Sequence, residues 1–221
     1  MLASIDPGTH RLTTQEIRRP DGRPGPWSID SAPAEAVVAL NAGQFTSRGP
    51  WGWVVRDGVE LRPPGSGPLA PALVVDAEGE VRLLPAEEIA AARGSGRVRE
   101  TIQSYPALLA GEGQIPPALL EPGRGVDLEH RDARLALCVL RDGRLLLALT
   151  RFEALGGALS TLFTTPETAA LMGALGCRRS MLLDGGISSQ LRLRERDGTV
   201  HRWRGIRRVP LALLALPAQG T

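Results

Sequence analysis

One carboxylate stands out as a group that could do chemistry. Asp184 follows the apolar run Met181-Leu182-Leu183, and Gly185 and Gly186 come directly after it. A charge at the tip of a buried strand is costly unless it has a partner or a task. The two glycines let the backbone bend sharply and approach a ligand closely. We interpret Asp184 as a catalytic candidate; the alternative is a plain Asp-Gly turn.

Hydroxyl groups follow the two glycines, at Ser188 and Ser189. Together with backbone N–H groups from Gly186 onward, these hydroxyls could form a concave site for an anion. We therefore expect Gly185, Gly186, Ser188 and Ser189 to bind the negatively charged part of a substrate.

Two arginines lie at matching ends of a predicted hairpin. Arg134 opens an apolar strand, and Arg151 ends its partner strand. Two guanidinium groups side by side repel each other unless an anion or a carboxylate lies between them. The pair therefore indicates an anion-binding site, with structural salt bridges as the alternative.

Asn41 is the only asparagine in the chain, and it follows the apolar run Val37-Val38-Ala39-Leu40. The ends of buried strands are where open α/β sheets present groups to ligands. Asparagine also makes turns, which is the alternative for this position.

Metal and cysteine chemistry are weakly indicated. The three histidines show no HxH or HExxH spacing, so we expect no zinc site; no cofactor is expected, and a divalent metal is left open. Cys138 and Cys177 have neither zinc nor CxxC spacing. We expect two buried free thiols, with one disulfide as the alternative.

Antiparallel hairpins dominate the elements that must position these residues. Short apolar runs flank Asp57-Gly58, Asp142-Gly143 and Asp197-Gly198, and residues 73–83 form a looser version. Asp-Gly supplies the positive φ that tight turns between antiparallel strands require. The pattern predicts an α+β fold, a β-rich mixed sheet with several antiparallel hairpins and a few helices, in one domain over residues 1–221.

Two helices are predicted. The longer one covers Thr165–Leu175, with Thr165 as its cap and Gly176 after its end. The shorter one covers Ala86–Arg93, after a proline.

Composition narrows the possible functions. All 26 basic residues are arginine, which is typical of a GC-rich genome, and acids lie among them, so that the net charge is only +2 and nucleic acid is not expected as a partner. Aromatic residues make up 4% of the chain, too few for a stacking platform.

The longest apolar run is roughly half a bilayer span, so no membrane insertion is expected. The N-terminus lacks the pattern of a signal peptide, which leaves a cytoplasmic protein or a trimmed secreted domain. The oligomeric state is left open.

Four segments, taken in order along the chain, resemble the phosphodiester glycosidase family. They are Asn41-Ala42-Gly43-Gln44-Phe45, the hairpin that Arg134 opens, the helix that ends at Gly176, and Leu183-Asp184-Gly185-Gly186-Ile187-Ser188. Gln44 stands where the family usually has phenylalanine, and Ile187 stands where it usually has a third glycine.

The resemblance implies a hydrolase that cleaves a sugar-1-phosphodiester, with an N-acetylglucosamine-like sugar and a small-molecule or glycan phosphodiester as its partner. Phosphate leaves more readily than an alcohol, so the second carboxylic acid of ordinary glycosidases is not needed. In this interpretation Asp184 is the nucleophile or base, Arg134 and Arg151 hold the phosphate, and Asn41 and Gly43 orient the sugar or Asp184. The alternative is a non-catalytic module of the same fold that binds sugar phosphates or cell-wall polymers.

Overall fold

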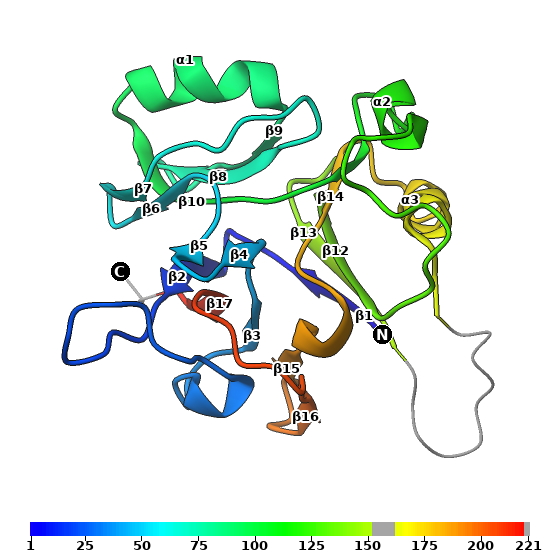
Figure 1. The fold of residues 1–221 in the computed structure, drawn as a ribbon. Coiled ribbons are helices and arrows are strands. Elements are labelled where there is room, and N and C mark those ends of the chain that lie inside the picture. The colour runs from blue at the N-terminus through cyan, green and yellow to red at the C-terminus, as the bar shows by residue number, and fades with distance from the viewer. Residues whose placement is uncertain (152–161, 219–221) are drawn as a thin grey trace.

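Three five-stranded sheets and a two-stranded ribbon make up this computed structural model, which describes residues 1–151 and 162–218 (Figure 1). We name each large sheet after its central strand. In spatial order, the β12 sheet contains β1 (Leu2–Ile5), β13 (Leu145–Thr150), β12 (Arg134–Val139), β14 (Ser180–Leu182) and β11 (Ala107–Leu109). The β10 sheet contains β7 (Val59–Arg62), β6 (Val54–Arg56), β10 (Val98–Gln103), β8 (Ala72–Asp76) and β9 (Val81–Leu84). The β3 sheet contains β16 (Val200–Trp203), β15 (Leu191–Arg194), β3 (Val38–Asn41), β17 (Ala212–Pro217) and β2 (His10–Gln15). The ribbon consists of β4 (Phe45–Thr46) and β5 (Gly49–Pro50).

The four predicted hairpins are confirmed as β6–β7, β8–β9, β12–β13 and β15–β16. Asp57 and Gly58 have φ values of 51° and 80°, the conformation that a tight Asp-Gly turn requires. The predicted β-rich fold with few helices is also confirmed. Its sheets are antiparallel rather than mixed in the described residues, because β14 returns from helix α3 (Thr165–Ala174) alongside β12 in the opposite direction.

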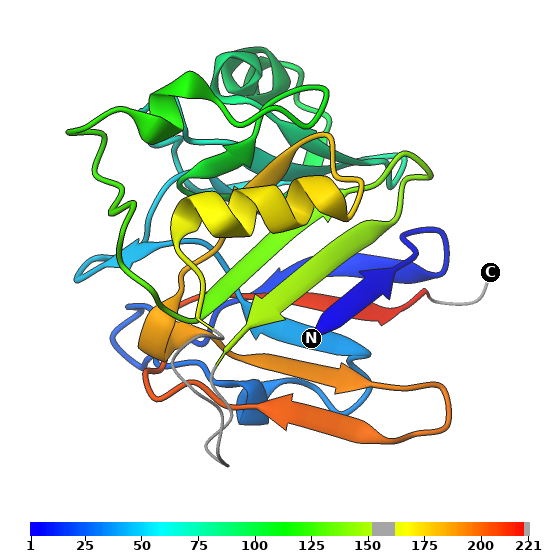
Figure 2. The ribbon, with the colours of Figure 1, turned by 90° about the vertical axis from the view of Figure 1, so that its right-hand side faces the viewer.

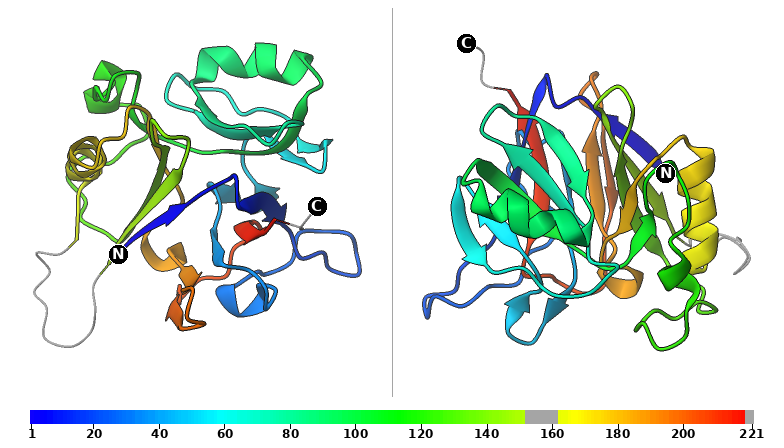
Figure 3. Two further views of the ribbon diagram at one scale, coloured as in Figure 1. Left: turned by 180° about the vertical axis from the view of Figure 1, so that it is seen from behind. Right: turned by 90° about the horizontal axis from the view of Figure 1, so that it is seen from above.

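Successive side chains of β12 point to opposite faces of its sheet and pack into two different apolar layers. Leu135 points into a core that the three large sheets share, together with Leu40 of β3 and Leu73 of β8. Ala136 points the other way and packs with α3. Figures 1 and 2 show α3 across the outer face of the β12 sheet, and Figure 3 shows from two further sides how the sheets enclose one interior. On the β10 sheet, α1 (Ile89–Gly94) covers the outer face in the same way.

Both predicted helices are present, with a correction at the start of α3. The cap is Thr164 rather than Thr165, because Thr164 Oγ1 accepts from the Glu167 N–H at 3.2 Å while the Glu167 carboxylate accepts from the Thr164 N–H at 2.9 Å. The shorter predicted helix consists of a 3-10 turn, Ala86–Glu88, followed by α1. The short helix α2 (Pro117–Leu120) was not predicted. In the described parts of the chain, every helix is too short or too polar to cross a bilayer.

The two cysteines form a disulfide, so the expectation of free thiols is wrong. Cys138 lies on the outer face of β12, and Cys177 follows α3, which covers that face. This packing places their Cα atoms 5.9 Å apart, a normal separation for a disulfide. Tertiary packing makes the contact across 39 residues, so the spacing of the cysteines carries no sequence signal.

Candidate active site

The chain crosses from the β12 sheet to the β3 sheet in the segment that carries Asp184. Residues 183–190 run from the end of β14 to the start of β15 and contain a 3-10 helix, Gly186–Ser188, seen as the orange turn at the lower left of Figure 2. Because β14 pairs with β12 and β15 pairs with β3, this crossing lies between the start of β12 and the end of β3. The pairing therefore brings Arg134 and Asn41 to the two sides of the crossing.

Asn41 holds the crossing in place from the β3 side. Its side-chain amide donates to the Asp184 carbonyl at 2.8 Å, and its side-chain oxygen accepts from the Gln190 N–H at 2.9 Å. The residue is fully buried. Its contacts are therefore those of a residue that positions Asp184 through the main chain.

Asp184 is partly buried, and burial raises the pKa of its carboxyl above the ordinary value. The Ser188 hydroxyl, the positive charge of Arg207 and the Gly185 N–H all stabilise the carboxylate and oppose this rise, whereas the negative charge of Asp132 adds to it. A carboxyl that is partly withdrawn from water beside a cation can transfer a proton or attack a positively charged carbon.

Close packing against the start of β12 favours glycine at Gly185, and a positive φ favours it at Gly186. A Cβ atom on Gly186, which has a φ of 59°, would lie 2.5 Å from Asp132 Oδ2, and one on Gly185 would lie 2.9 Å from the Ala133 carbonyl oxygen. The Gly186 N–H donates to that same Ala133 oxygen at 2.8 Å.

Most of the backbone N–H groups that were expected to bind an anion thus already donate to carbonyls of the protein. The N–H groups of Ser188 and Ser189 donate to the carbonyls of Gly185 and Gly186, each at 3.1 Å, within the 3-10 turn. An anion at this crossing would therefore depend on side chains. Ser189 is suited to this, because its hydroxyl is buried and has no hydrogen-bond partner in the described structure.

The two predicted arginines both lie near the crossing, and main-chain carbonyls bind each of them. Arg134 donates from Nε to the Phe163 carbonyl at 3.0 Å and from Nη2 to the His130 carbonyl at 2.6 Å. Arg151 donates from Nη1 to the Arg204 carbonyl at 3.0 Å. Arg134, which is partly buried, therefore has the contacts of a residue that positions neighbouring segments.

A cavity of about 200 Å³ lies beside the crossing and includes three of the predicted residues, Arg151, Gly186 and Ser189. Asp184 does not line it, although its neighbours along the chain do. The other lining residues are Asp132, Ala133, Leu162, Ile187, Arg204, Gly205 and Ile206.

Gly43 has a packing role at the turn after β3. A Cβ atom there would lie 2.3 Å from the Gln103 carbonyl oxygen, so only glycine fits. The next residue, Gln44, extends this contact, because its side-chain oxygen accepts from the Tyr105 N–H at 2.7 Å. The turn after β3 is thereby joined to the end of β10.

Sequence reasoning missed Arg207 and Asp132, the two charged residues that act on the Asp184 carboxyl. The Arg207 guanidinium also lies 4.8 Å above the centre of the Phe45 ring, which links the crossing to the ribbon. Asp132 could have been found from its position two residues before Arg134. Arg207 lies among several arginines of residues 202–208, and no sequence signal distinguishes it.

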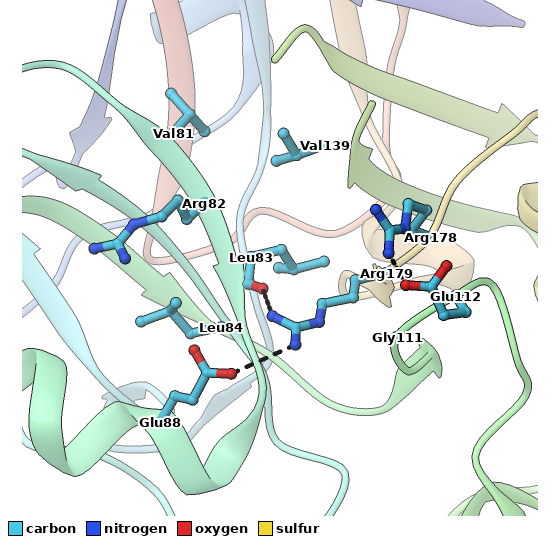
Figure 4. Close-up of a pocket in the computed structure, with 10 residues that line it drawn as sticks. All are labelled: Val81, Arg82, Leu83, Leu84, Glu88, Gly111, Glu112, Val139, Arg178 and Arg179. Atoms are coloured by element: carbon cyan, nitrogen blue, oxygen red, sulfur yellow. Dashed lines mark hydrogen bonds and ion pairs between the residues drawn. The ribbon is translucent and has the colours of Figure 1, made fainter. Parts of the chain in front are cut away.

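A second cavity, of about 370 Å³, lies between β9 and the end of α3, and two of its three arginines are paired with glutamates (Figure 4). Arg178 forms an ion pair with Glu112, and Arg179 reaches Glu88 at 3.4 Å and the Leu83 carbonyl at 3.3 Å. This cavity is therefore less suited to binding an anion than the crossing is. No group of three or more potential metal-binding side chains occurs in residues 1–151 and 162–218.

Comparison with known proteins gives one family match. The model of the phosphodiester glycosidase family matches residues 34–215. Among curated proteins, no significant match is found.

Solved structures share the fold at low sequence identity. The catalytic domain of zebrafish N-acetylglucosamine-1-phosphodiester alpha-N-acetylglucosaminidase, auto-inhibited by its pro-peptide, is 15% identical, with a TM-score of 0.66 over 99% of this chain and 84% of that one. A hypothetical protein from Synechocystis is 17% identical, with a TM-score of 0.61 over 98% of this chain and 59% of that one. A protein from Burkholderia pseudomallei is 17% identical, with a TM-score of 0.57 over 98% of this chain and 73% of that one.

Proposed function

Because the chain belongs to the phosphodiester glycosidase family, we propose that it hydrolyses the bond between the anomeric carbon of a sugar and a phosphodiester group. Water supplies the hydroxyl group that ends on the sugar, and the phosphate leaves as a monoester with its alcohol still attached. The likeness to the zebrafish enzyme supports an N-acetylglucosamine-like sugar.

The placement of Asp184 is the observation that carries this proposal. Its main chain is fixed by the buried Asn41, and its carboxyl is partly withdrawn from water next to Ser188 and Arg207. An anomeric carbon gains positive charge as the phosphate departs, and a fixed carboxylate stabilises that charge. We assign Asp184 to this role, as the nucleophile or as the base that activates water.

The leaving phosphate needs positive charge rather than an acid. We assign this task to Arg207 and Arg151, with the unpartnered hydroxyl of Ser189 as an additional donor. Arg134 and Asn41 act as positioning residues through their bonds to the main chain.

An isotope experiment tests the reaction and the bond that breaks. The protein is incubated in ¹⁸O-labelled water with an N-acetylglucosamine-1-phosphodiester, and the products are identified by phosphorus NMR and mass spectrometry. The proposal expects labelled free sugar and an unlabelled phosphate monoester. Release of sugar-1-phosphate would contradict it, because that product requires cleavage on the other side of the phosphorus.

The same substrate separates catalysis from binding alone. A higher melting temperature with the substrate present, but without turnover, would favour the non-catalytic binding module.

A further inference from the structure

We propose that a cationic groove beside the candidate site binds a second anionic group, so that the preferred substrates carry more than one phosphate. This inference rests on the proposed function for the identity of the ligand. The groove has a volume of about 790 Å³ and lies between the loop of residues 19–26, the β4–β5 ribbon and residues 208–210.

The groove concentrates positive charge. Its lining contains five arginines and a single acidic residue, Asp21, which gives a local net charge of +4 in a chain whose total is +2. The arginines are Arg19, Arg23, Arg48, Arg62 and Arg208.

Most of these arginines have no carboxylate partner. Arg23 lies 3.8 Å from Asp21, and Arg62 donates to the Arg48 carbonyl at 3.2 Å. In the described part of the chain, Arg19, Arg48 and Arg208 form no ion pair, and the charge of Arg208 acts at longer range on the Asp30 carboxylate. Two of the three arginines of the cavity in Figure 4 are paired with glutamates, a larger share than in this groove. Guanidinium groups that gather without acids repel one another, and an anion between them removes that repulsion.

The groove adjoins the crossing that holds Asp184. Phe45 of the ribbon lines the groove, and Arg207 covers its ring at 4.8 Å while its charge acts on Asp184. Along residues 204–210, Arg204 lines the cavity beside the crossing and Arg208 lines the groove. A substrate whose scissile phosphate lies near Arg207 can therefore extend its alcohol portion into the groove.

Repeated phosphate suits this lining better than nucleic acid does. Among the described residues, Phe45 is the only aromatic one that lines the groove, and the Arg207 guanidinium lies over its ring. The groove lining itself therefore offers bases little aromatic surface for stacking, whereas phosphate groups need only the guanidinium groups.

Two matched substrates and two matched variants test the groove. One sugar-1-phosphodiester ends in glycerol and the other ends in glycerol phosphate, and each is assayed with wild type and with the Arg19→Gln/Arg48→Gln variant. The control is Arg141→Gln/Arg196→Gln, which removes the same charge from two exposed hairpin turns. We expect KM for the phosphate-bearing substrate to rise about tenfold in the groove variant, as for the loss of two exposed ion contacts. Both kcat and KM for the glycerol substrate stay unchanged, and the control behaves as wild type.

Binding of tripolyphosphate tests whether the groove binds anions, independently of any hydrolysis. Weaker binding in the groove variant but not in the control supports the anion site, even if neither sugar substrate is cleaved; in that case the proposed function alone fails. Equal binding by both variants, or an equal rise in KM for both substrates, would overturn the inference. A single-stranded oligonucleotide that binds through Arg19 and Arg48 more tightly than tripolyphosphate would also overturn it.

Discussion

The side-chain amide of Asn41 donates a hydrogen bond to the main-chain carbonyl of Asp184 at 2.8 Å, across 143 residues of sequence. The same side chain accepts from the Gln190 N–H, so one buried residue fixes both ends of the crossing. The position of the candidate catalytic carboxyl therefore depends on a residue that makes no contact with solvent.

Replacing Asn41 with alanine leaves a buried carbonyl and a buried N–H without partners. We expect the free energy of unfolding to fall by about 2–6 kcal/mol, since each of the two unsatisfied groups costs about 1–3 kcal/mol. We also expect kcat to fall more than KM rises, because Asp184 is displaced. Urea denaturation and steady-state kinetics measure both effects. A variant of normal stability that has lost only substrate affinity would show that Asn41 contacts the sugar.

Replacing Asp184 with asparagine separates activity from stability. We expect hydrolysis to fall by about three to five powers of ten, as for other catalytic carboxylates. Because the folded state raises the pKa of this carboxyl, its contribution favours folding at low pH and is lost as the pH rises through the interval between the unfolded and folded pKa values. At pH 7 the variant is therefore at least as stable as wild type, which thermal unfolding can check. Unchanged activity would remove Asp184 from the mechanism.

The charge of Arg207 lowers the pKa of Asp184, against the larger effect of burial, which raises it. Since activity in our proposal needs the carboxylate, kcat/KM rises with pH through the pKa of Asp184. In Arg207→Gln the loss of positive charge moves this rise to higher pH, and the shift is small because the arginine is exposed and water screens its charge. Arg207→Lys keeps the charge and serves as the control. A shift to lower pH in the glutamine variant would refute the assignment.

Arg134→Lys tests whether this arginine positions the site or holds phosphate. Lysine lacks the planar fork that reaches both the His130 and Phe163 carbonyls, so we expect a loss of about 1–2 kcal/mol of stability. Activity on phosphodiesters with a charged alcohol and on those with an uncharged alcohol then changes by the same factor. Arg151→Lys is the comparison, and there we expect a rise in KM with little change in melting temperature. Selective loss of phosphodiester binding in Arg134→Lys would restore its phosphate-holding role.

Reduction of the Cys138–Cys177 bond is expected to lower the stability of the protein. A crosslink that closes 39 residues contributes about 4 kcal/mol in the loop-entropy model. Guanidinium denaturation with and without reductant measures the difference, and Cys138→Ala/Cys177→Ala gives the same comparison without reductant. An unchanged midpoint after complete reduction would contradict the expectation.

Local patterns predicted the hairpins, both helices and the segments that form the crossing, because turn and cap residues act within a few positions of one another. The sequence also indicated Asn41 and Asp184, whose types are unusual beside apolar runs. It could not predict that Asn41 would bind the Asp184 main chain, nor that Gly186 would face Asp132, because these contacts depend on how two sheets pack. Arg207 was missed for the same reason, since one arginine among several looks like the others until Phe45 and Asp184 are placed beside it.

The position of Arg207 between Asp184 and the groove couples two equilibria. An anion bound beside this arginine offsets its charge, weakens its hold on the Asp184 carboxylate and makes protonation of that group easier. Thermodynamic linkage requires the reverse as well, so a protonated Asp184 strengthens anion binding by the same factor. Anionic inhibitors would therefore bind more tightly as the pH falls, and the phosphate monoester released by hydrolysis would slow the next turnover most in acid.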